Sequence, residues 1–548
     1  MRTSLTRHAP LVALAAAVAA SVALLLVLTA GLTHFQDSWA FLMHRQGFSA
    51  DVFLAPHNEH IVLIPVALEK LFLEVFGMGS ATPEYVLLTL MLATTAVLLF
   101  VYVRRRLGAW PAVFAAVLLL FLGPAWQVLL WPFEVGFVGA VMAGIAMLLA
   151  LEREDERGDA IACGLLAVAL GFSTLAVTFA VAAAVDVLQR RRSRGLGRAY
   201  LVLVPIFLFG LWYLGWGRDA ESHLTLANVL ASPQFLLDGL ASSLDSLLGL
   251  GTVDVHGVGQ PEWGRPLLVA AIVLVGYGQV RKPGFSSRLW PVLAAAVCFW
   301  LLAAFNYIPG REAVASRYAY AGAAFTLLIA AELLRGVRFG PRALWVGAVV
   351  TIAAVASNLG PLRDGRDVLE EQTVLTRADL GALEIAARTV EPSFALTPGV
   401  AGTASLIDVS AGDYLTLAQE HGSPAYSPGE LADAAEAGRR QADVVLSQAL
   451  PLSTVTEVGV EPDLPGRRCV PADATPELEL APGTTTAIVV PPGPRASFSV
   501  RRFAVGEYPV STEGAPGDSV TLLRIPRDRA PQSWWLRVEA EQPARVCR

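Results

Sequence analysis

Long apolar runs alternate with short polar breaks over the first two thirds of the chain. A run of roughly 18 or more apolar residues forms a helix that can cross the hydrocarbon core of a bilayer. The run at 160–188 is too long for one such helix. Because Gly171–Thr174 supplies helix-breaking and capping residues in its middle, this run predicts a hairpin of two helices. The pattern predicts about eleven transmembrane helices, from runs near 10–32, 84–103, 110–131, 133–151, 160–188, 199–216, 265–280, 289–307, 317–334 and 342–358.

The polar breaks predict how these helices are oriented. Four of them are rich in arginine or lysine, and basic residues in short loops stay on the cytoplasmic side. We therefore predict a plasma-membrane protein with a cytoplasmic N-terminus and an extracytoplasmic C-terminal tail. The first run lacks a clear small-residue cleavage site, so it predicts a retained anchor helix. The basic breaks are Arg104–Arg106, Arg190–Arg194 with Arg198, Arg281–Lys282, and Arg335–Arg342.

Two long segments share the predicted outer face. One is the loop 33–83, in which Ile61–Gly77 mixes apolar and charged residues, as in a helix that lies along a membrane surface. The other is the tail, which has helical spacing at first and then short β-type runs between proline and glycine turns. The expected regions are a transmembrane domain at 1–358, a helical outer region at 359–450 and a β-rich outer domain at 451–548 that ends in a small β-sandwich.

Composition supports a membrane protein with a soluble tail. Of 548 residues, 54% are hydrophobic and 16% are charged, and the mean hydropathy is +0.54, which excludes an ordinary soluble enzyme. Residues 359–548 contain 26 acidic residues and 17 arginines, a net charge of −9, whereas the whole chain carries −6, so the first 358 residues carry +3. This division argues against nucleic acid as a partner.

The four cysteines agree with an outer tail. Cys163 and Cys298 lie in apolar runs, where a cysteine packs as a small hydrophobic side chain. Cys469 and Cys547 stand at the two ends of the β-rich segment, and an oxidising compartment would let them form a disulfide. Two free thiols are the alternative.

The densest polar cluster of the membrane half follows the first apolar run. A carboxylate at a membrane surface can serve as a general base when partial burial and neighbouring charges tune its pKa. The plainer interpretation of Asp37 is a polar helix end that meets water. For Trp39 the alternatives are stacking on a sugar and anchoring at the membrane interface. The cluster holds half of the chain's eight histidines, and its members are His34, Gln36, Asp37, Trp39, His44, Arg45, Asp51, His57, Asn58, Glu59 and His60.

A divalent metal ion is one interpretation of His57, Glu59 and His60, because two histidines three positions apart can share a helix face. A hydrogen-bonded loop and direct contact with a substrate are the other two. The sequence has no His-Glu-x-x-His motif and shows no fixed third ligand. No other cofactor is expected, since we find neither a P-loop nor a convincing dinucleotide glycine motif.

A second cluster lies at Asn306–Glu312 and continues to Arg317 and Tyr318 at the start of an apolar run. An arginine at this depth can pair bidentately with a phosphate, and it stays charged when it is partly desolvated. The alternative is an arginine whose charge reaches out to the membrane surface beside an interfacial tyrosine.

Four features lie together in this order: an acid just after the first helix, a surface helix in the same loop, an outer Arg-Tyr pair and a soluble outer tail. In these features residues 1–358 resemble the C-type glycosyltransferase superfamily, in particular its actinobacterial members. Those proteins are integral membrane enzymes that take a sugar from a polyprenyl-phosphate donor and pass it to an acceptor outside the cytoplasm. The resemblance implies this fold, a polyprenyl-phosphate sugar donor, and an envelope glycan, lipid or protein as acceptor.

The resemblance also implies roles for individual residues. Asp37 matches the loop acid that acts as catalytic base on the acceptor hydroxyl, and Arg317 and Tyr318 resemble the pair that meets the donor phosphate. Many members carry two adjacent acids in this loop, so here Asp51 or Glu59 would supply the second carboxylate. Support of the loop or the acceptor is expected from His34, Trp39, Asp51, His57 and His60.

Two further segments share features with the superfamily. Phe172–Thr174 resembles the short-helix turn of bacterial members, and we assign it no chemistry. The tail resembles outer domains that bind glycans, in which Trp534 and Trp535 would form either a stacking platform or part of the β-sandwich core. The expected function is a membrane glycosyltransferase with Asp37 and Glu59 as its catalytic acids. The alternatives are a non-catalytic membrane protein that presents a glycan-binding outer domain, and a transporter of lipid-linked envelope material.

Overall fold

The computed structural model describes residues 2–190, 194–254, 257–281, 284–396, 405–407, 409–450, 452–458, 468–472, 477–492, 496–506, 508–540 and 544–547. Arg191, Arg192 and Lys282, which belong to the basic breaks of the sequence, lie outside these ranges. The chain divides into two compact units. Unit 1 comprises Met1–Gly31, Arg45–Phe72 and Thr82–Val368, and unit 2 comprises Leu32–His44, Leu73–Ala81 and Leu369–Arg548.

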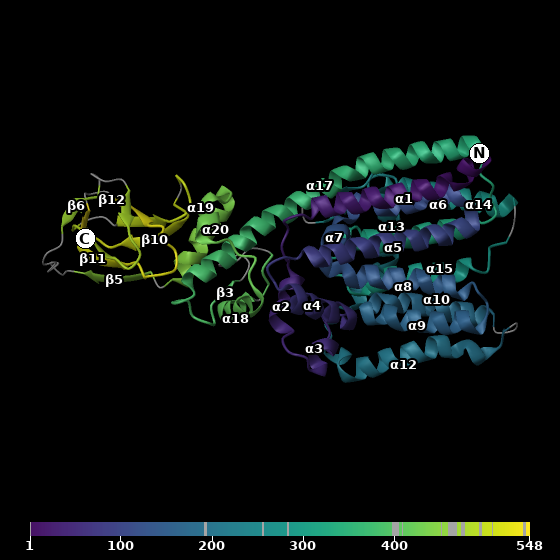
Figure 1. Cartoon of the computed structure of the whole chain (residues 1–548), viewed down its shortest axis with the longest axis horizontal. Coiled ribbons are helices and arrows are strands. Elements are labelled where there is room, and N and C mark those ends of the chain that lie inside the picture. Colours follow the sequence, from purple (N-terminus) through teal and green to yellow (C-terminus); the bar gives the residue numbers. More distant parts are fainter. Residues whose placement is uncertain are drawn as a thin grey trace. The chain divides into compact units, whose positions relative to one another are not determined.

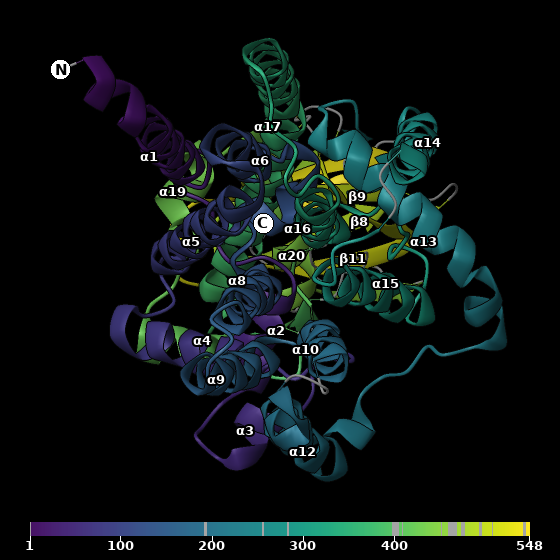
Figure 2. The ribbon, with the colours of Figure 1, turned by 90° about the vertical axis from the view of Figure 1, so that its right-hand side faces the viewer.

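Unit 1 is a bundle of helices, most of which are seen end-on in Figure 2. A helix lies at every apolar run of the sequence. Its helices at these runs are α1 (Arg2–Leu28), α5 (Thr82–Leu107), α6 (Ala109–Leu120), α7 (Trp126–Leu130), α8 (Val135–Leu151), α9 (Glu156–Phe172), α10 (Val177–Gln189), α12 (Tyr200–Gly215), α14 (Gly264–Arg281), α15 (Leu289–Phe305), α16 (Ser316–Leu333) and α17 (Pro341–Ala386) (Figure 1).

Several of these helices are long and apolar enough to cross a membrane. Five qualify among the described residues, and a sixth qualifies if α6 and the segment Gly123–Leu130, bent by 45° against each other, form one broken span. Shorter apolar helices lie at Thr174–Gln189, Gly264–Val280 and Leu289–Phe305. The chain is therefore that of a membrane-embedded protein, and the count of eleven spans stays a prediction. The five are in the segments His8–Leu28, Thr82–Leu107, Pro132–Leu151, Leu196–Gly215 and Pro341–Ala386.

The hairpin predicted at 160–188 is confirmed. Helix α9 ends at Phe172, a short 3₁₀ turn covers Thr174–Ala176, and α10 begins at Val177. The Ser173 hydroxyl caps this turn by accepting a hydrogen bond from the Leu175 N–H at 3.2 Å. A serine does this well because its short side chain satisfies backbone N–H groups that a helix start leaves without partners.

Ion pairs gather the arginine-rich connections at one end of the bundle, here called the arginine end. Arg106 in the last turn of α5 pairs with Glu152 after α8 and with Glu332 in α16. These ion pairs bring together residues of three of the four basic breaks, those that contain Arg106, Arg190 and Arg335. The other pairs at this end are Arg105 with Glu152, Arg190 with Glu154 and Asp186, Arg194 with Asp159, Arg198 with Asp159 and Asp186, Arg288 with Glu152 and Glu154, and Arg335 with Glu332.

Two helices lie across the direction of the bundle and appear lengthwise in Figure 2. One is α4 (Leu63–Phe76), the helix that the mixed pattern of Ile61–Gly77 predicts. The other is α13 (Leu226–Leu247), which lies between the predicted apolar runs at 199–216 and 265–280. The Thr225 hydroxyl caps α13 by accepting a hydrogen bond from the Asn228 N–H at 3.1 Å. The hydropathy pattern misses α13 because polar residues interrupt its apolar positions.

Helix α17 runs without a break from Pro341 to Ala386, although it contains Pro361. The predicted domain boundary at 358 therefore falls inside a helix, and the division between the units comes at Val368. Unit 2 begins with the last part of α17 and adds the short strands β3 (Ala395–Leu396) and β4 (Val409–Ser410). Its other helices are α2 (Asp37–His44), α18 (Ala411–His421), α19 (Pro428–Asp433) and α20 (Glu436–Ala449).

A β-sandwich closes the chain, as the sequence predicts. Its two sheets have the strand orders β10-β9-β12-β7 and β5-β11-β8-β13-β6, and side chains of both sheets share one apolar core. Trp534 is fully buried in that core, so only Trp535 keeps partial exposure on the opposite face of its strand. The strands are β5 (Ser453–Val458), β6 (Cys469–Pro471), β7 (Leu478–Leu480), β8 (Thr485–Val490), β9 (Ala496–Arg501), β10 (Val510–Ala515), β11 (Ser519–Arg524), β12 (Trp534–Ala540) and β13 (Arg545–Cys547).

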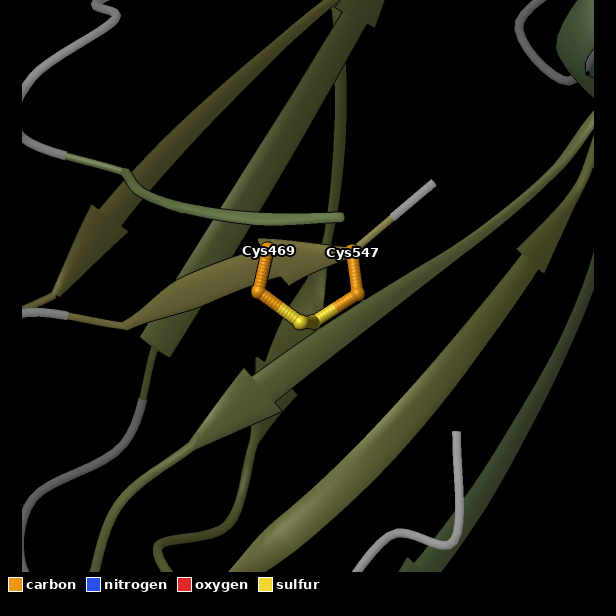
Figure 3. The surroundings of a disulfide bond; sticks show 2 residues. All are labelled: Cys469 and Cys547. Atoms are coloured by element: carbon orange, nitrogen blue, oxygen red, sulfur yellow. A yellow bond between two sulfur atoms is a disulfide. The ribbon is translucent and has the colours of Figure 1, made fainter. Parts of the chain in front are cut away.

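The predicted disulfide joins Cys469 in β6 to Cys547 in β13 (Figure 3). The two residues are direct partners in the antiparallel pairing of these strands, and they are 78 positions apart in the sequence. The bond therefore closes the β-rich segment near its two ends. Cys163 and Cys298 are free thiols in half-buried positions.

A buried ion pair holds the inner part of the β-sandwich. The Arg502 guanidinium and the Asp528 carboxylate are both fully buried, and they bond through two N–H groups at 2.6 and 3.0 Å. Arg502 also donates to the backbone carbonyls of Ala530 and Gln532. Charges in a protein interior are tolerated when such bonds satisfy them, and removing one partner leaves the other charge unpaired.

We expect Asp528→Ala to destabilise the β-sandwich by about 3–5 kcal/mol, because Arg502 keeps a buried charge without its ionic partner. Proteolysis of the full-length protein at increasing urea concentration measures this loss. The control is Glu539→Ala, whose pair with Arg537 is exposed and 3.6 Å long, so it should cost no more than about 1 kcal/mol. Equal urea midpoints for the two variants would contradict the prediction.

Candidate functional site

A tight turn at His57–His60 forms the centre of the polar cluster of unit 1. The backbones of His57 and His60 exchange two hydrogen bonds of 3.0 and 2.9 Å. Asn58 has a φ of 49°, a left-handed conformation that asparagine adopts more readily than most residues. The turn therefore presents the Glu59 side chain from a fixed backbone.

The hairpin between α9 and α10 fastens this turn. The Thr174 hydroxyl donates to the Glu59 carbonyl at 3.2 Å and accepts from the Ile61 N–H at 3.1 Å. The Ser173 hydroxyl lies 3.3 Å from Nδ1 of His60. Sequence analysis assigns no chemistry to Phe172–Thr174, yet two of its side chains position the turn. Only their capping role is visible in the sequence, because the contacts join segments more than a hundred residues apart.

Glu59 forms an ion pair with Arg311. Nη1 of Arg311 lies 3.1 and 3.0 Å from the two carboxylate oxygens, and Nε2 of His60 lies 3.6 Å from one of them. Burial raises the pKa of Glu59, but the charges of His60 and Arg311 outweigh it, so the pKa of this carboxyl lies below its usual range. Glu59 is therefore ionised and already bound at neutral pH.

The surroundings of His60 lower its pKa. Burial lowers its pKa, the Glu59 carboxylate opposes that effect, and the charges of Arg311, His57 and Arg317 lower the pKa further. The net result is a pKa below the usual range of histidine. The same interactions show that Arg317 lies close enough to the turn for its charge to act there.

Arg317 is the cation of this cluster that forms no ion pair with a described residue. It stands in the first turn of α16, next to Ser316, whose N–H donates to the Gly257 carbonyl at 2.6 Å and whose hydroxyl accepts from the Gln127 N–H at 3.2 Å. Within the described residues no carboxylate lies in ion-pair distance of Arg317, and its buried Nε has no hydrogen-bond partner. This half-buried guanidinium is thus able to bind an anion.

The ring of Tyr318 is buried rather than open to a ligand. It makes edge contacts with Phe235, Phe299 and Trp300, at centroid distances of 6.4, 6.2 and 6.3 Å. These contacts fix the start of α16 and with it the backbone of Arg317. The structure thus places the two members of the predicted Arg-Tyr pair in different surroundings.

An apolar groove lies between α10 and α15. Its volume is about 550 Å³, and Val181, Val185, Val297, Leu301 and Phe305 are among its lining residues. Helix α10 begins three residues after Thr174, which holds the turn, and α15 ends at Phe305, six residues before Arg311. A groove of this kind suits a hydrocarbon chain, because it offers apolar surface and few polar groups.

The structure does not arrange His57, Glu59 and His60 as a metal centre. Their possible ligand atoms do not all lie within 4.8 Å of one another, Glu59 is bound to Arg311, and Nδ1 of His60 meets Ser173. The ring of His57 packs edge-on against Phe133, with the centroids 5.2 Å apart. The interpretation as a hydrogen-bonded loop therefore fits these residues better than the metal interpretation.

Asp51 has a structural partner in unit 1. Its carboxylate accepts a hydrogen bond from Nε1 of Trp216 at 2.8 Å. Arg45 closes the same loop by donating to the backbone carbonyls of Val52, Ala55 and Pro56. These contacts support the expected role of Asp51 in holding the loop.

The predicted residues His34, Asp37 and Trp39 belong to unit 2. Trp39 is fully buried there: its Nε1 donates to the His34 carbonyl at 3.0 Å, and its ring meets Tyr414 edge-on. The predictions that Trp39 stacks on a sugar or anchors in a membrane interface are therefore wrong. Asp37 is the first residue of α2 and is half-buried. The apolar side chains of α2 pack into the core of unit 2, so the predicted base stands on a helix that this core fixes.

Comparison with known proteins adds no assignment. No family model matches the chain, and no curated protein matches it. The arguments about function therefore rest on the residues and on the geometry of the cluster.

We expect Thr174→Val to loosen the turn, because it leaves the Glu59 carbonyl and the Ile61 N–H without their shared partner. Loss of these bonds should speed hydrogen exchange at residues 57–61 by about tenfold or more, as measured by mass spectrometry of the protein in nanodiscs. The matched control is Thr94→Val, which removes an exposed hydroxyl bonded only to the Leu90 carbonyl of its own helix. The prediction fails if the two variants exchange alike at 57–61.

Proposed function

We propose that this protein is a membrane glycosyltransferase that moves a sugar from a polyprenyl-phosphate donor to an envelope glycan, lipid or protein. The observation that carries the proposal is the half-buried Arg317, which has no carboxylate partner among the described residues and stands beside a fixed polar cluster. The same unit also has an apolar groove between α10 and α15. A lipid phosphate needs both features, an apolar surface for its chain and a cation for its head group.

In this proposal the groove and the arginines bind different parts of the donor. The polyprenyl chain occupies the groove of α10 and α15, and the phosphate bonds to Arg317. Arg311 stays with Glu59 and adds positive potential near the same place. As the sugar leaves, negative charge grows on the phosphate oxygens, and a fixed guanidinium stabilises that charge more than it stabilises the ground state.

Asp37 is the proposed base, on the strength of its match to the loop acid of the C-type superfamily. A general base takes the proton of the acceptor hydroxyl in the transition state. Glu59 is poorly suited to that work, because Arg311 binds both of its oxygens and the pKa of Glu59 is lowered. We therefore propose Glu59 as a positioning residue that holds Arg311.

The proposal includes a topology of eleven spans, with the arginine end in the cytoplasm and the C-terminal tail outside. The gathering of the described basic connections at one end supports it, because such residues are retained on the cytoplasmic side. The Cys469–Cys547 bond also supports it, since disulfides persist in oxidising compartments outside the cytoplasm.

We expect Arg317→Gln to slow sugar transfer by about a hundredfold or more, because the departing phosphate loses its cation. Arg317→Lys should recover part of this loss, since it restores the charge but not the two-pronged geometry. Release of polyprenyl phosphate from a panel of polyprenyl-phosphate sugars, measured in nanodiscs, reports the rate. The matched control is Arg265→Gln, because Arg265 lies in an exposed pair with Asp238.

We expect Asp37→Asn to abolish transfer while donor binding persists, because the amide cannot accept the acceptor proton. Glu59→Gln should reduce the rate less, and the exposed Asp219→Asn should leave it unchanged. If the wild-type protein consumed no donor of the panel but bound envelope glycan, the glycosyltransferase proposal would be wrong and the non-catalytic alternative would stand.

A further inference from the structure

A second site of unit 1 centres on Asp245, in the last turn of α13. Its side chain is fully buried, and among the residues that the structure describes neither carboxylate oxygen has a hydrogen-bond partner. The backbone around it is well ordered by contrast, because the Leu248 and Leu250 N–H groups both donate to the Asp245 carbonyl. No described residue therefore offsets the cost of burying this carboxylate.

Asp245 lines a small cavity. The space open to the centre of a water molecule is about 10 Å³, enough for a single water or a single ion. Ser242, Ser246, Thr252 and Gln260 supply polar side chains to its wall, and Asp245 is the charged side chain among the described residues that line it. The cavity therefore holds one negative charge among neutral oxygen-bearing groups.

Three electrostatic terms oppose an isolated negative charge here. Burial of an unpaired carboxylate costs several kcal/mol. The end of α13 adds the partial negative charge of its unsatisfied carbonyl groups. Burial raises the pKa of Asp245 to about 6, and the charge of Glu262 acts in the same direction. A cation bound next to the carboxylate would offset these terms.

We propose that this cavity binds one monovalent metal cation of the size of sodium, with the Asp245 carboxylate and the neutral oxygens of the wall as its ligands. The charge decides the valence. One carboxylate neutralises one positive charge, whereas a divalent ion would leave a surplus charge in a buried cavity. Oxygen ligands of this kind suit hard cations.

The bound cation would tie the start of α16 to its surroundings. The wall combines the hairpin of β1 (Thr252–Val253) and β2 (Gly259–Gln260) with Val314 and Ala319, which stand on either side of Arg317 in the sequence. The Gly259 N–H also donates to the Val314 carbonyl at 2.9 Å. Occupancy of the cavity therefore fixes the segment that presents Arg317, whatever reaction that arginine serves.

The test uses full-length protein in nanodiscs at pH 7.5. Binding of radioactive sodium should saturate at one ion per chain in the wild type and be lost in Asp245→Asn. Replacing choline chloride by sodium chloride at constant ionic strength should raise the Tm of the wild type by about 2–4 °C. Hydrogen exchange at residues 257–260 and 312–319 should slow under the same change.

Asp238→Asn is the matched control, since Asp238 lies two turns earlier in α13 and pairs with the exposed Arg265. It should keep the sodium response. If Asp245→Asn does not fold, Ser242→Ala should fold and bind sodium more weakly. The proposal is overturned if the folded wild type binds no sodium, or if sodium raises the Tm of Asp245→Asn as much as it raises that of the wild type. It is also overturned if only calcium or magnesium raises the Tm of the wild type. A wild type that resists heat equally in sodium and choline would show that a proton alone neutralises Asp245.

Discussion

The ion pair between Glu59 and Arg311 is the contact on which the polar cluster of unit 1 depends. It joins two loops that are 252 positions apart in the sequence, one held by the α9–α10 hairpin and the other leading into α16. Both oxygens of Glu59 face one nitrogen of Arg311, so the pair sets the distance between the loops as well as their charge balance. Arg317 lies six residues after Arg311, so the ion pair restrains the segment that leads to Arg317.

The two ends of the bundle treat arginine in opposite ways. At the arginine end, Arg106 and Arg198 each form ion pairs with two carboxylates, so side chains of the protein itself neutralise their charges. At the other end, the half-buried Arg317 has no carboxylate partner among the described residues, and its buried Nε forms no hydrogen bond with any of them. A protein gains stability from the first arrangement and loses it in the second, so an arginine of the second kind is better explained by a ligand than by folding.

Local patterns in the sequence suffice for part of this architecture. The apolar runs, the turn at Ser173, strand β8 and the Cys469–Cys547 pair follow from periodicity, capping residues and spacing. Helix α13 could not be predicted from the hydropathy pattern, because polar residues interrupt its apolar positions. The length of α17 could not be predicted either, because its helical pattern changes from apolar to charged without a helix-ending signal. Contacts between distant segments, such as Thr174 with Glu59 or Trp39 with Tyr414, leave no local trace at all.

Buried and half-buried carboxylates of this protein show that the partner, more than the depth, decides what an acid can do. Asp443 accepts the backbone N–H groups of Arg502, Phe503 and Ala504, which makes it a fastener of the β-sandwich. Glu59 is bound by a guanidinium and so positions rather than reacts. Asp245 is as deeply buried as Asp443, yet it faces a cavity instead of donors. Where the described residues leave a buried acid without a hydrogen-bond partner, in a space that fits one ion, a bound ion is a physical explanation for keeping that acid.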